Sequence, residues 1–177
     1  MTTVAIARYG AGNVRSVELA CRRLGAEVVD DLAAADLAIL PGVGSARAAM
    51  TGLGESADLL RERHAAGKPI LGICLGLQLA LDETEEDGGV AGLALVPGRA
   101  VRLRAPRVPR IGWAQVAPGE EAYWFAHSYE ALTDATVATS EGHAAIVESG
   151  SFIGVQFHPE KSGPAGARFL EKCLSRA

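Results

Sequence analysis

The sequence predicts a three-layer α/β fold with a central mixed sheet, mostly parallel in the first half of the chain and flanked by helices. From Val4 to about residue 83, short apolar segments alternate with helical patterns, which is typical of a parallel sheet covered on both faces. From Leu93 onward, strand-like segments follow one another with little helix between them. The 177 residues, 49% hydrophobic and 21% charged, have the size and composition of a globular domain, so residues 1–177 are expected to form a single domain.

The first half of the chain contains four expected strands. The segment VAIAR begins at Val4, and the amphipathic helical pattern that follows it ends at Gly25. The Ala- and Leu-rich segment from Ala46 to Ala66 is expected to be helical, with an interruption near Gly52 and Gly54. The other expected elements are strands at 27–30, 36–40 and 69–74 and a helix at 75–83.

The second half is richer in expected strands. They lie at 93–104, 122–130, 135–140, 143–149 and 152–157, and a final helix is expected at 164–174. The acidic run at 82–87 and the arginines between Arg99 and Arg110 are most simply solvated surface, because charge runs are usually exposed.

Net charge, apolar runs and cysteine content limit the kinds of partner and the cellular compartment to be expected. A net charge of -4 argues against nucleic acid or an anionic membrane as the main partner, and no apolar run approaches the ~20 residues of a membrane span. Cys21, Cys74 and Cys173 lie far apart and are odd in number, so neither a disulfide framework nor a metal site is expected. The N-terminus lacks a signal-peptide pattern. We therefore expect a reduced, cytoplasmic protein without metal or cofactor.

Cys74 stands between Gly72 and Gly76 in the most hydrophobic segment, ILGICLGLQLAL. A strand followed by Gly-x-Cys-x-Gly and a helix is the pattern of a nucleophile elbow with sulfur in place of oxygen. At a helix N-terminus the free N–H groups and the helix dipole favour a thiolate, and the N–H of Leu75 can bind an oxyanion. The alternative is a buried structural cysteine beside unrelated glycines.

A nucleophilic thiol needs a base, and His158 is the best of four histidines. It closes an apolar strand and precedes a proline, which favours extended geometry, so Glu160 lies on the same side and can orient its imidazole. His127 is a second candidate, whereas His64 lies at a polar helix end and His143 has no obvious partner. A strand-end histidine bonded only at the surface is the alternative.

The segment PGVG, from Pro41 to Gly44, follows a buried strand of the same expected sheet. Ligands of parallel sheets bind at the carboxyl ends of strands, where such a loop can direct a second N–H toward a reacting carbonyl. A simple tight turn is the alternative.

Together, GICLGLQL, GVQFHPEKS and PGVG resemble the class I glutamine amidotransferases, whose glutaminase domains use a Cys–His–Glu triad. The resemblance covers essentially the whole chain. Within that class, YGAGNVRSV, RIGW, FAHSYE and HPEKS are similar to the glutaminase subunits of imidazole glycerol phosphate synthase, which serve histidine biosynthesis.

The resemblance implies a fold, a reaction and a partner. The fold is the three-layer amidotransferase fold, and the reaction hydrolyses the glutamine side-chain amide through a cysteine thioester. The ammonia would pass to a (β/α)8-barrel cyclase in a heterodimer, which makes imidazole glycerol phosphate and aminoimidazole carboxamide ribotide. The implied residues are the triad Cys74, His158 and Glu160; the oxyanion hole of Val43 and Leu75; the glutamine contacts Gly44, Gln78, Glu86, Ser128 and Tyr129; and the partner-interface residues Asn13, Trp113 and Lys161.

The chain departs from the family pattern in two segments near the expected partner. Arg8 stands where many relatives have Asp, and RIGWA at Arg110 to Ala114 replaces His-Met-Gly-Trp-Asn. Both departures bear on docking and leave the triad unchanged. Gly42 and Gly44 are also expected to let the Val43 peptide turn toward or away from the oxyanion when the partner binds.

Three other functions remain open from the sequence. The chain could be a glutaminase subunit for anthranilate or pyridoxal phosphate synthesis, another thiol hydrolase on the same fold such as a peptidase or γ-glutamyl hydrolase, or a non-catalytic binding subunit.

Overall fold

The computed structural model describes residues 1–10 and 13–177, so Ala11 and Gly12 of the YGAGN segment lie outside the described residues. Its main feature is a seven-stranded mixed sheet in the order β11-β12-β13-β4-β3-β1-β2. Strands β2, β1, β3, β4 and β13 are parallel, whereas β12 is antiparallel to β13 and β11 is antiparallel to β12. The bounds are β1 Thr3–Ile6, β2 Glu27–Val29, β3 Leu37–Leu40, β4 Ile70–Ile73, β11 Thr136–Ser140, β12 His143–Ser149 and β13 Phe152–Val155.

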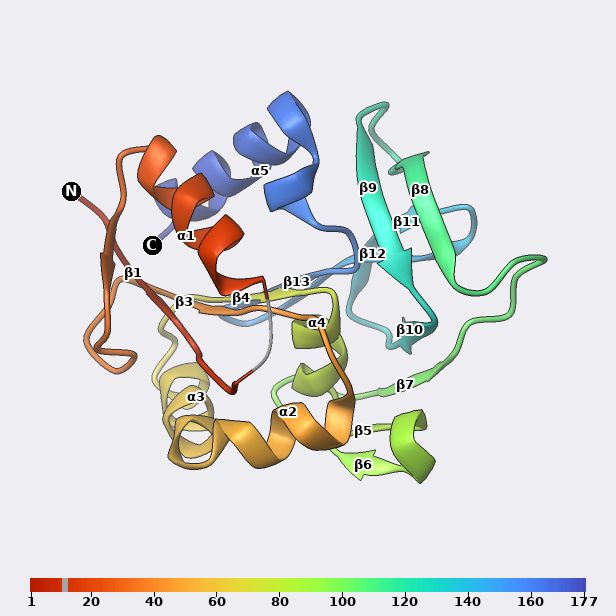
Figure 1. Cartoon of the computed structure of the whole chain (residues 1–177), viewed down its shortest axis with the longest axis horizontal. Helices are drawn as coiled ribbons and strands as arrows, with labels where there is room; N and C mark the ends of the chain where they lie inside the picture. The colour runs from red at the N-terminus through yellow and green to blue at the C-terminus, as the bar shows by residue number, and fades with distance from the viewer. Residues whose placement is uncertain (11–12) are drawn as a thin grey trace.

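Helices cover both faces of this sheet, as Figure 1 shows with the sheet seen nearly edge-on. Helices α1 and α5 lie on one side, and α2, α3 and α4 lie on the other. The bounds are α1 Val14–Arg23, α2 Ala46–Leu53, α3 Glu55–Ala65, α4 Leu75–Ala80 and α5 Gly163–Ser175. The predicted three-layer fold, with its mixed and mostly parallel sheet, is therefore confirmed.

Strand β3 shows why the layers form. All four of its residues are buried, and they alternate between two cores. Leu37 and Ile39 pack on the side of α1 and α5, whereas Ala38 and Leu40 pack on the side of α2, α3 and α4. A strand buried on both faces reads as a continuous apolar run, which is the pattern the sequence shows there.

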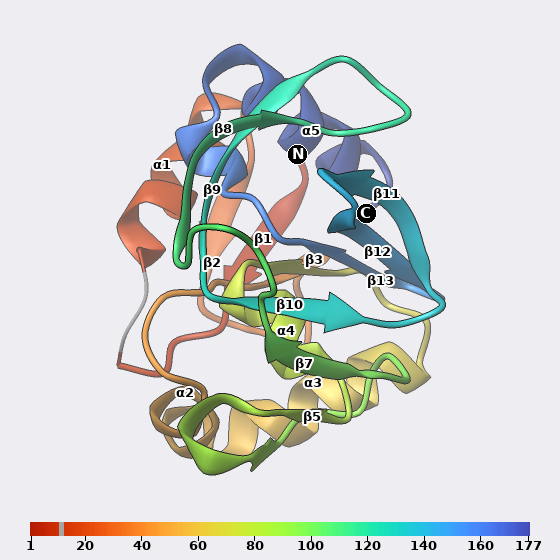
Figure 2. The same ribbon diagram turned by 90° about the vertical axis from the view of Figure 1, so that its right-hand side faces the viewer.

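Two smaller sheets stand beside the carboxyl ends of the parallel strands, as the rotated view in Figure 2 makes clear. One has the order β10-β7-β5-β6 and the other is the β8–β9 hairpin. Their bounds, with two short 3-10 helices, are β5 Glu83–Thr84, η1 Glu86–Gly88, β6 Val90–Ala91, β7 Arg99–Arg102, β8 Arg110–Gln115, β9 Ala122–His127, β10 Tyr129–Leu132 and η2 Pro159–Lys161.

The first small sheet corrects the expected helix at 75–83. Helix α4 ends at Ala80, because Leu81 is extended and the next residues pair with β6 and β7. The segment at 110–115 is a strand that the sequence did not indicate, since none of its residues is fully buried. Among the helices of the described residues, none has the length and hydrophobicity needed to cross a membrane.

Candidate active site

Cys74 lies at the sharp turn between β4 and α4. Its φ and ψ of 52° and -105° are unusual for a residue with a side chain, which is the strained geometry of a nucleophile elbow. Its N–H donates to Val155 O on the neighbouring strand at 2.7 Å, which holds the turn against the sheet. The thiol is thus presented at the N-terminus of α4, at the carboxyl end of the sheet.

The two flanking glycines permit close packing. A Cβ at Gly72 would lie 2.9 Å from Gly76 O, and one at Gly76 would lie 2.0 Å from Leu40 O. Both distances are shorter than real side chains tolerate. The glycines therefore let α4 pack directly on β4 and on the end of β3. This close packing is the reason that glycines flank Cys74.

The PGVG loop approaches the elbow just as closely. A Cβ at Gly42 would lie 2.2 Å from Ile73 O and 2.3 Å from Leu75 N, so this loop touches the backbone of the elbow. Gly42 is therefore required for the close contact between the loop and the elbow. This role differs from the expected one, which was to let the Val43 peptide turn. Gly44, with φ of 110°, is the glycine of this loop with a backbone that favours glycine. The buried hydroxyl of Tyr9 donates to Pro41 O at 2.8 Å and fixes the start of the loop.

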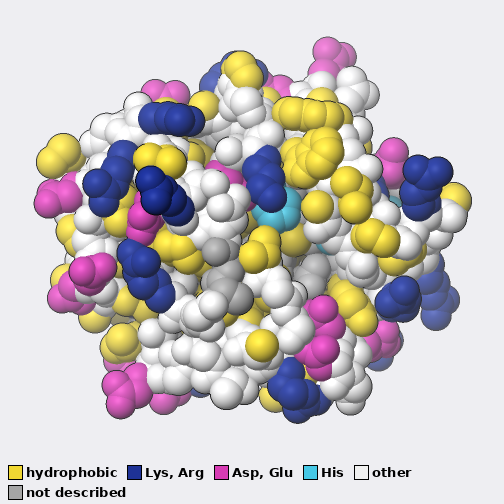
Figure 3. Space-filling view, in the orientation of Figure 1, with side chains coloured by type: hydrophobic (Ala, Val, Ile, Leu, Met, Phe, Trp, Pro, Cys, Tyr) yellow, Lys and Arg dark blue, Asp and Glu magenta, His cyan; other side chains and the backbone are white. Residues whose placement is uncertain are grey.

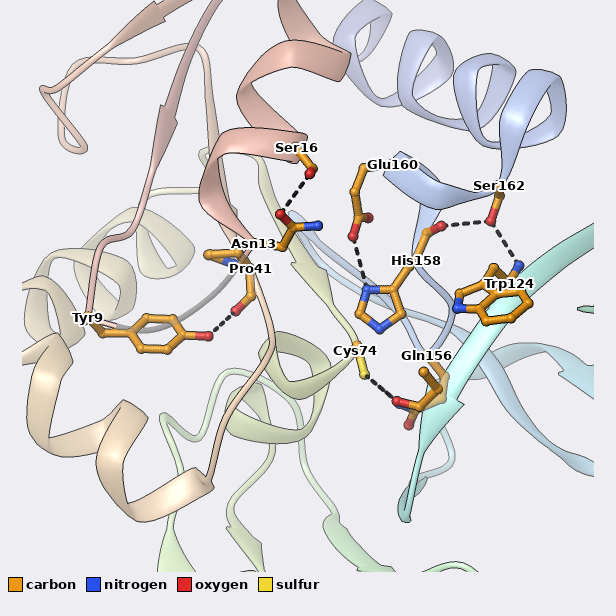
Figure 4. A network of polar contacts seen from close by, with 11 residues as sticks. Tyr9, Asn13, Ser16, Pro41, Cys74, Trp124, Gln156, His158, Glu160 and Ser162 are labelled. Carbon is orange, nitrogen blue, oxygen red and sulfur yellow. Dashed lines mark hydrogen bonds and ion pairs between the residues drawn. The ribbon is translucent and has the colours of Figure 1, made fainter. Parts of the chain in front are cut away.

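His158 and Glu160 form a buried pair beside the thiol. His158 Nδ1 lies 3.0 Å from Glu160 Oε1, and both side chains are almost inaccessible to solvent. Burial acts to lower the pKa of His158, but hydrogen bonds and charge interactions with Cys74 and Glu160 outweigh it and raise the pKa to about 9. The imidazole is therefore readily protonated at neutral pH while it contacts the sulfur. In Figure 4 the His158 ring lies between the Glu160 carboxylate and the Cys74 sulfur.

Backbone contacts tie this pair to strand β9. The N–H of His158 donates to Trp124 O at 2.8 Å, and Trp124 N–H donates to Ser162 Oγ at 2.9 Å. The Ser162 hydroxyl in turn donates to His158 O at 2.7 Å. The HPEKS segment is thus anchored at both ends of its short turn, which keeps the imidazole in place.

His127, the second candidate base, has a different environment. Its Nδ1 lies 2.8 Å from Tyr129 O and must carry the proton, because a carbonyl oxygen can only accept. Burial lowers the pKa of His127 to about 4. The ring is thus neutral at physiological pH and bonded away from the triad.

His143 also differs from its expected state. It was expected to lack a partner, but its Nδ1 lies 2.6 Å from Glu130 Oε2 on strand β10. The two residues come from different sheets, so their separation along the chain hides the pair.

The predicted catalytic and glutamine-binding residues converge on one pocket of about 280 Å³. Glu160 stands behind His158, outside the pocket lining. The predicted residues that line the pocket are Val43, Gly44, Cys74, Leu75, Gln78, Glu86, Ser128, Tyr129, His158 and Lys161.

Glu86 shows that the acidic run is more than solvated surface. Its Oε2 accepts the N–H of Ala46 at 3.1 Å, and Asp87 Oδ2 accepts the N–H of Arg47 at 3.0 Å, so both carboxylates bind the N-terminus of α2. Burial raises the pKa of Glu86, with the Ala46 N–H acting against it. The helix end therefore supports a carboxylate at the edge of the pocket.

The three predicted interface residues lie in different parts of the structure, and the pocket lining includes one of them. Lys161 lines the pocket, Trp113 is 56% exposed on β8, and Asn13 accepts a hydrogen bond from Ser16 Oγ at 2.7 Å at the start of α1. Ile111, on the same strand as Trp113, is 62% exposed. Figure 3 shows a histidine in the central hollow of this face, with hydrophobic side chains gathered on the side of β8 and β9.

Sequence reasoning missed Gln156, which lies between Cys74 and Gln78. Gln156 is two residues before His158 in an extended segment, so the two-residue period of strands would have placed it on the same side. Tyr9 and Ser162, which hold the loop and the HPEKS segment, were also missed, although both lie inside the quoted motifs.

Comparison with known proteins identifies the class to which this site belongs. Residues 5–177 match the family described as glutamine amidotransferase class-I. The chain belongs to this family. Two solved structures at 19% identity share its fold: one titled glutamine amidotransferase, with a TM-score of 0.78 and all of both chains covered, and PurLQS from Thermotoga maritima, with a TM-score of 0.74 and 99% of both chains covered.

Within the family, the chain groups with proteins named imidazole glycerol phosphate synthase subunit HisH. The protein of that name from Methanothermobacter thermautotrophicus is 42% identical over 188 residues, covering 94% of this chain and 95% of the relative. The one from Natronomonas pharaonis is also 42% identical, over 98% of this chain and 96% of the relative. The one from Moorella thermoacetica is 41% identical, over 97% and 93%.

Proposed function

We propose that this chain is the glutaminase subunit of an imidazole glycerol phosphate synthase in histidine biosynthesis. The observation that carries the proposal is the convergence of Cys74 and His158 on one pocket, with Glu160 held against His158, in a chain 42% identical to two HisH subunits over nearly its whole length. Residues 1–177 would act as a single glutaminase domain. Its free cysteines, Cys21, Cys74 and Cys173, suit a reducing cytoplasm.

The reaction begins with attack of the Cys74 thiolate on the side-chain carboxamide carbon of glutamine. The oxygen becomes an oxyanion that accepts hydrogen bonds from the N–H groups of Leu75 and Val43. His158 then gives its proton to the departing nitrogen, so that ammonia leaves and a γ-glutamyl thioester remains on the sulfur. A raised pKa suits His158 to this step, because the imidazolium is already present at neutral pH.

Hydrolysis of the thioester completes the cycle. The imidazole, now neutral, takes a proton from water as the water attacks the thioester carbonyl. The C–S bond breaks, and glutamate leaves once its new γ-carboxyl group has given its proton to water. The sulfur is released as the thiolate next to the imidazolium, so atoms and charge balance. Glu160 orients the ring and supports its positive charge throughout.

The pocket supplies groups for the amino-acid end of glutamine. Glu86 faces the α-ammonium with a carboxylate held at the N-terminus of α2, and Gln78, Gly44, Ser128 and Tyr129 complete the site. Each of these roles is a proposal that rests on pocket geometry and on the charge of the substrate.

Ammonia released into bulk water becomes ammonium, which is not nucleophilic, so it must pass directly to a second enzyme. We propose a barrel-shaped cyclase docked over the pocket mouth, with Trp113, Asn13 and Lys161 at the interface. The three relatives at 41–42% identity are all named as subunits of imidazole glycerol phosphate synthase, so partners from anthranilate or pyridoxal phosphate synthesis are not favoured.

The test is reconstitution with a cyclase subunit of imidazole glycerol phosphate synthase. Glutamate release should rise when the cyclase and its nucleotide substrate are added, and imidazole glycerol phosphate should form from glutamine. Anthranilate synthase and pyridoxal phosphate synthase partners serve as controls and should not stimulate hydrolysis. Stimulation by one of these controls instead of the cyclase would refute the assignment.

A further inference from the structure

A chain of side-chain amides leads from strand β10 to the nucleophilic sulfur. Gln78 Nε2 donates to Tyr129 O at 3.0 Å and to Gln156 Oε1 at 3.2 Å. Gln156 Nε2 then lies 3.5 Å from Cys74 Sγ, as a donor to the sulfur. Gln156 is completely buried and Gln78 is 4% exposed, so neither amide exchanges these contacts for bulk water. In Figure 4, Gln156 and His158 meet the Cys74 side chain from different directions.

The orientation of each amide follows from the backbone carbonyl of Tyr129, where this series of hydrogen bonds begins. Because Tyr129 O can only accept, Gln78 must turn its NH2 group toward it. The second hydrogen of that NH2 then requires an oxygen from Gln156, which leaves the NH2 of Gln156 facing the sulfur. Reversing either amide would place two acceptors or two donors against each other, so the fold determines both orientations.

The arrangement has a consequence for the sulfur. A hydrogen bond to the charged form of a group favours that form, so an N–H directed at Cys74 Sγ supports the thiolate. Besides the His158 imidazole, which contacts the sulfur, Ala126 O lies 3.8 Å away and accepts a hydrogen bond only from the protonated thiol. Gln156 therefore joins His158 in stabilising the ionised nucleophile.

The arrangement also has a consequence for the ligand. Both hydrogens of the Gln78 amide are used within the protein, which leaves its Oε1 as the remaining polar atom. Gln78 lines the pocket, so it offers an acceptor to a ligand that carries N–H groups, such as the ammonium of an amino acid.

We propose that Gln156 is a positioning residue for the glutaminase reaction: its NH2 group supports the Cys74 thiolate, and its carbonyl oxygen orients Gln78 toward the bound glutamine. The second part rests on the proposed function, because it takes glutamine to be the ligand. The first part stands on the contacts of the sulfur alone. A buried glutamine that only filled space would affect stability and leave the ionisation of the thiol unchanged.

The test measures the ionisation of Cys74 directly. The rate of alkylation by iodoacetamide is followed against pH in the full chain, with mass spectrometry to locate the label, because only the thiolate reacts. Gln156→Met keeps the length of the side chain and removes both hydrogen bonds. Gln156→Asn keeps the amide but is one methylene too short to reach both partners. Gln115→Met, at an exposed position on β8, is the matched control.

We expect the midpoint of the alkylation profile to rise by about one pH unit in Gln156→Met, which is a tenfold change in the thiol–thiolate equilibrium. Gln156→Asn should shift the midpoint in the same direction by less, and Gln115→Met should match the wild type. The other titratable groups around the pocket and the sulfur are unchanged in these variants: Tyr9, Glu86, His127, Tyr129, His158, Glu160 and Lys161. A wild-type midpoint in a folded Gln156→Met or Gln156→Asn chain would overturn the proposal.

A second measurement separates this inference from the proposed function. In complex with the cyclase, Gln156→Met and Gln78→Met should both raise the KM for glutamine, by roughly tenfold for a lost oriented hydrogen bond. Wild-type protein that hydrolyses no glutamine would refute the proposed function and leave the alkylation result meaningful. If the wild-type protein is active and the variants keep its KM and its alkylation midpoint, the role of Gln156 is refuted and the proposed function stands.

Discussion

The close approach of Gly42 to the elbow gives a sharp prediction for the substitution Gly42→Ala. The new Cβ would lie 2.2 Å from Ile73 O, 2.3 Å from Leu75 N and 2.6 Å from Gly76 N, all of them backbone atoms. An ordinary contact needs 3.4 Å or more, so the loop and the elbow must separate by about 1 Å, the difference between 3.4 and 2.3 Å. The substitution therefore moves the two peptide N–H groups proposed for the oxyanion hole away from each other.

The expected cost has two parts. Misplacing a catalytic group by about 1 Å lowers a rate roughly 10²-fold, so glutamine hydrolysis should fall by about that factor. Overpacking typically costs about 1–3 kcal/mol of stability, and each kcal/mol lowers Tm by about 2–4 °C in a domain of this size. The assay is glutamate release by the complex with cyclase and nucleotide, beside a thermal unfolding curve of the isolated chain.

Gly119→Ala is the matched control, because its Cβ would meet only Val116 O, at 3.4 Å. It should keep the wild-type rate. Formation of product by the Gly42→Ala complex from externally supplied ammonia should also be unchanged, since that step uses the partner. A Gly42→Ala chain with the wild-type rate of glutamine hydrolysis would show that the loop does not set the oxyanion hole.

Gly44→Val separates loop contact from loop movement. Gly44 has φ of 110°, a backbone conformation that Val rarely adopts, so the substitution should hinder a turn of the Val43 peptide. We expect it to lower the partner-stimulated rate far more than the unstimulated rate, whereas Gly42→Ala should lower both. A Gly44→Val complex that responds normally to cyclase and nucleotide would exclude the loop as the switch.

Three further predictions concern the triad and its neighbours. Cys74→Ser should abolish glutamine hydrolysis while ammonia-dependent product formation persists, because serine has no anion at neutral pH; an active serine variant would contradict the nucleophile. In a burst assay of thioester formation, His158→Ala should lose more than His127→Ala, and Glu160→Gln should cost less than loss of His158; equal loss from both histidines would contradict the choice of base. In urea unfolding at several pH values, His127, whose pKa falls from 6.5 to about 4 in the folded state, should contribute stability above pH 6.5 that is lost as the pH falls through 4. His127→Gln should flatten that slope, and an unchanged slope would contradict the buried neutral state.

Much of the site follows from local sequence patterns. The Gly-x-Cys-x-Gly pattern was enough to place Cys74 at a strand-to-helix turn. The predicted contact between His158 and Glu160 is present, and His158 is extended as expected, but Glu160 lies in the 3-10 turn η2, so the expected extended segment does not continue to it. The order of strand and helix in the first half predicted the parallel part of the sheet. These features depend on backbone geometry over a few residues, which the local sequence determines.

Other features depended on segments that are distant in the sequence. The Gln156 amide has its orientation because Tyr129 O, 27 positions earlier, dictates that of Gln78. The Glu130–His143 pair joins two different sheets, and the short extent of α4 follows from strand pairing with β6 and β7. Hydrogen bonds and strand pairs between such segments form only when the whole chain is folded, so composition and periodicity determined the layers and the triad, and only the tertiary structure decided which polar groups orient the sulfur.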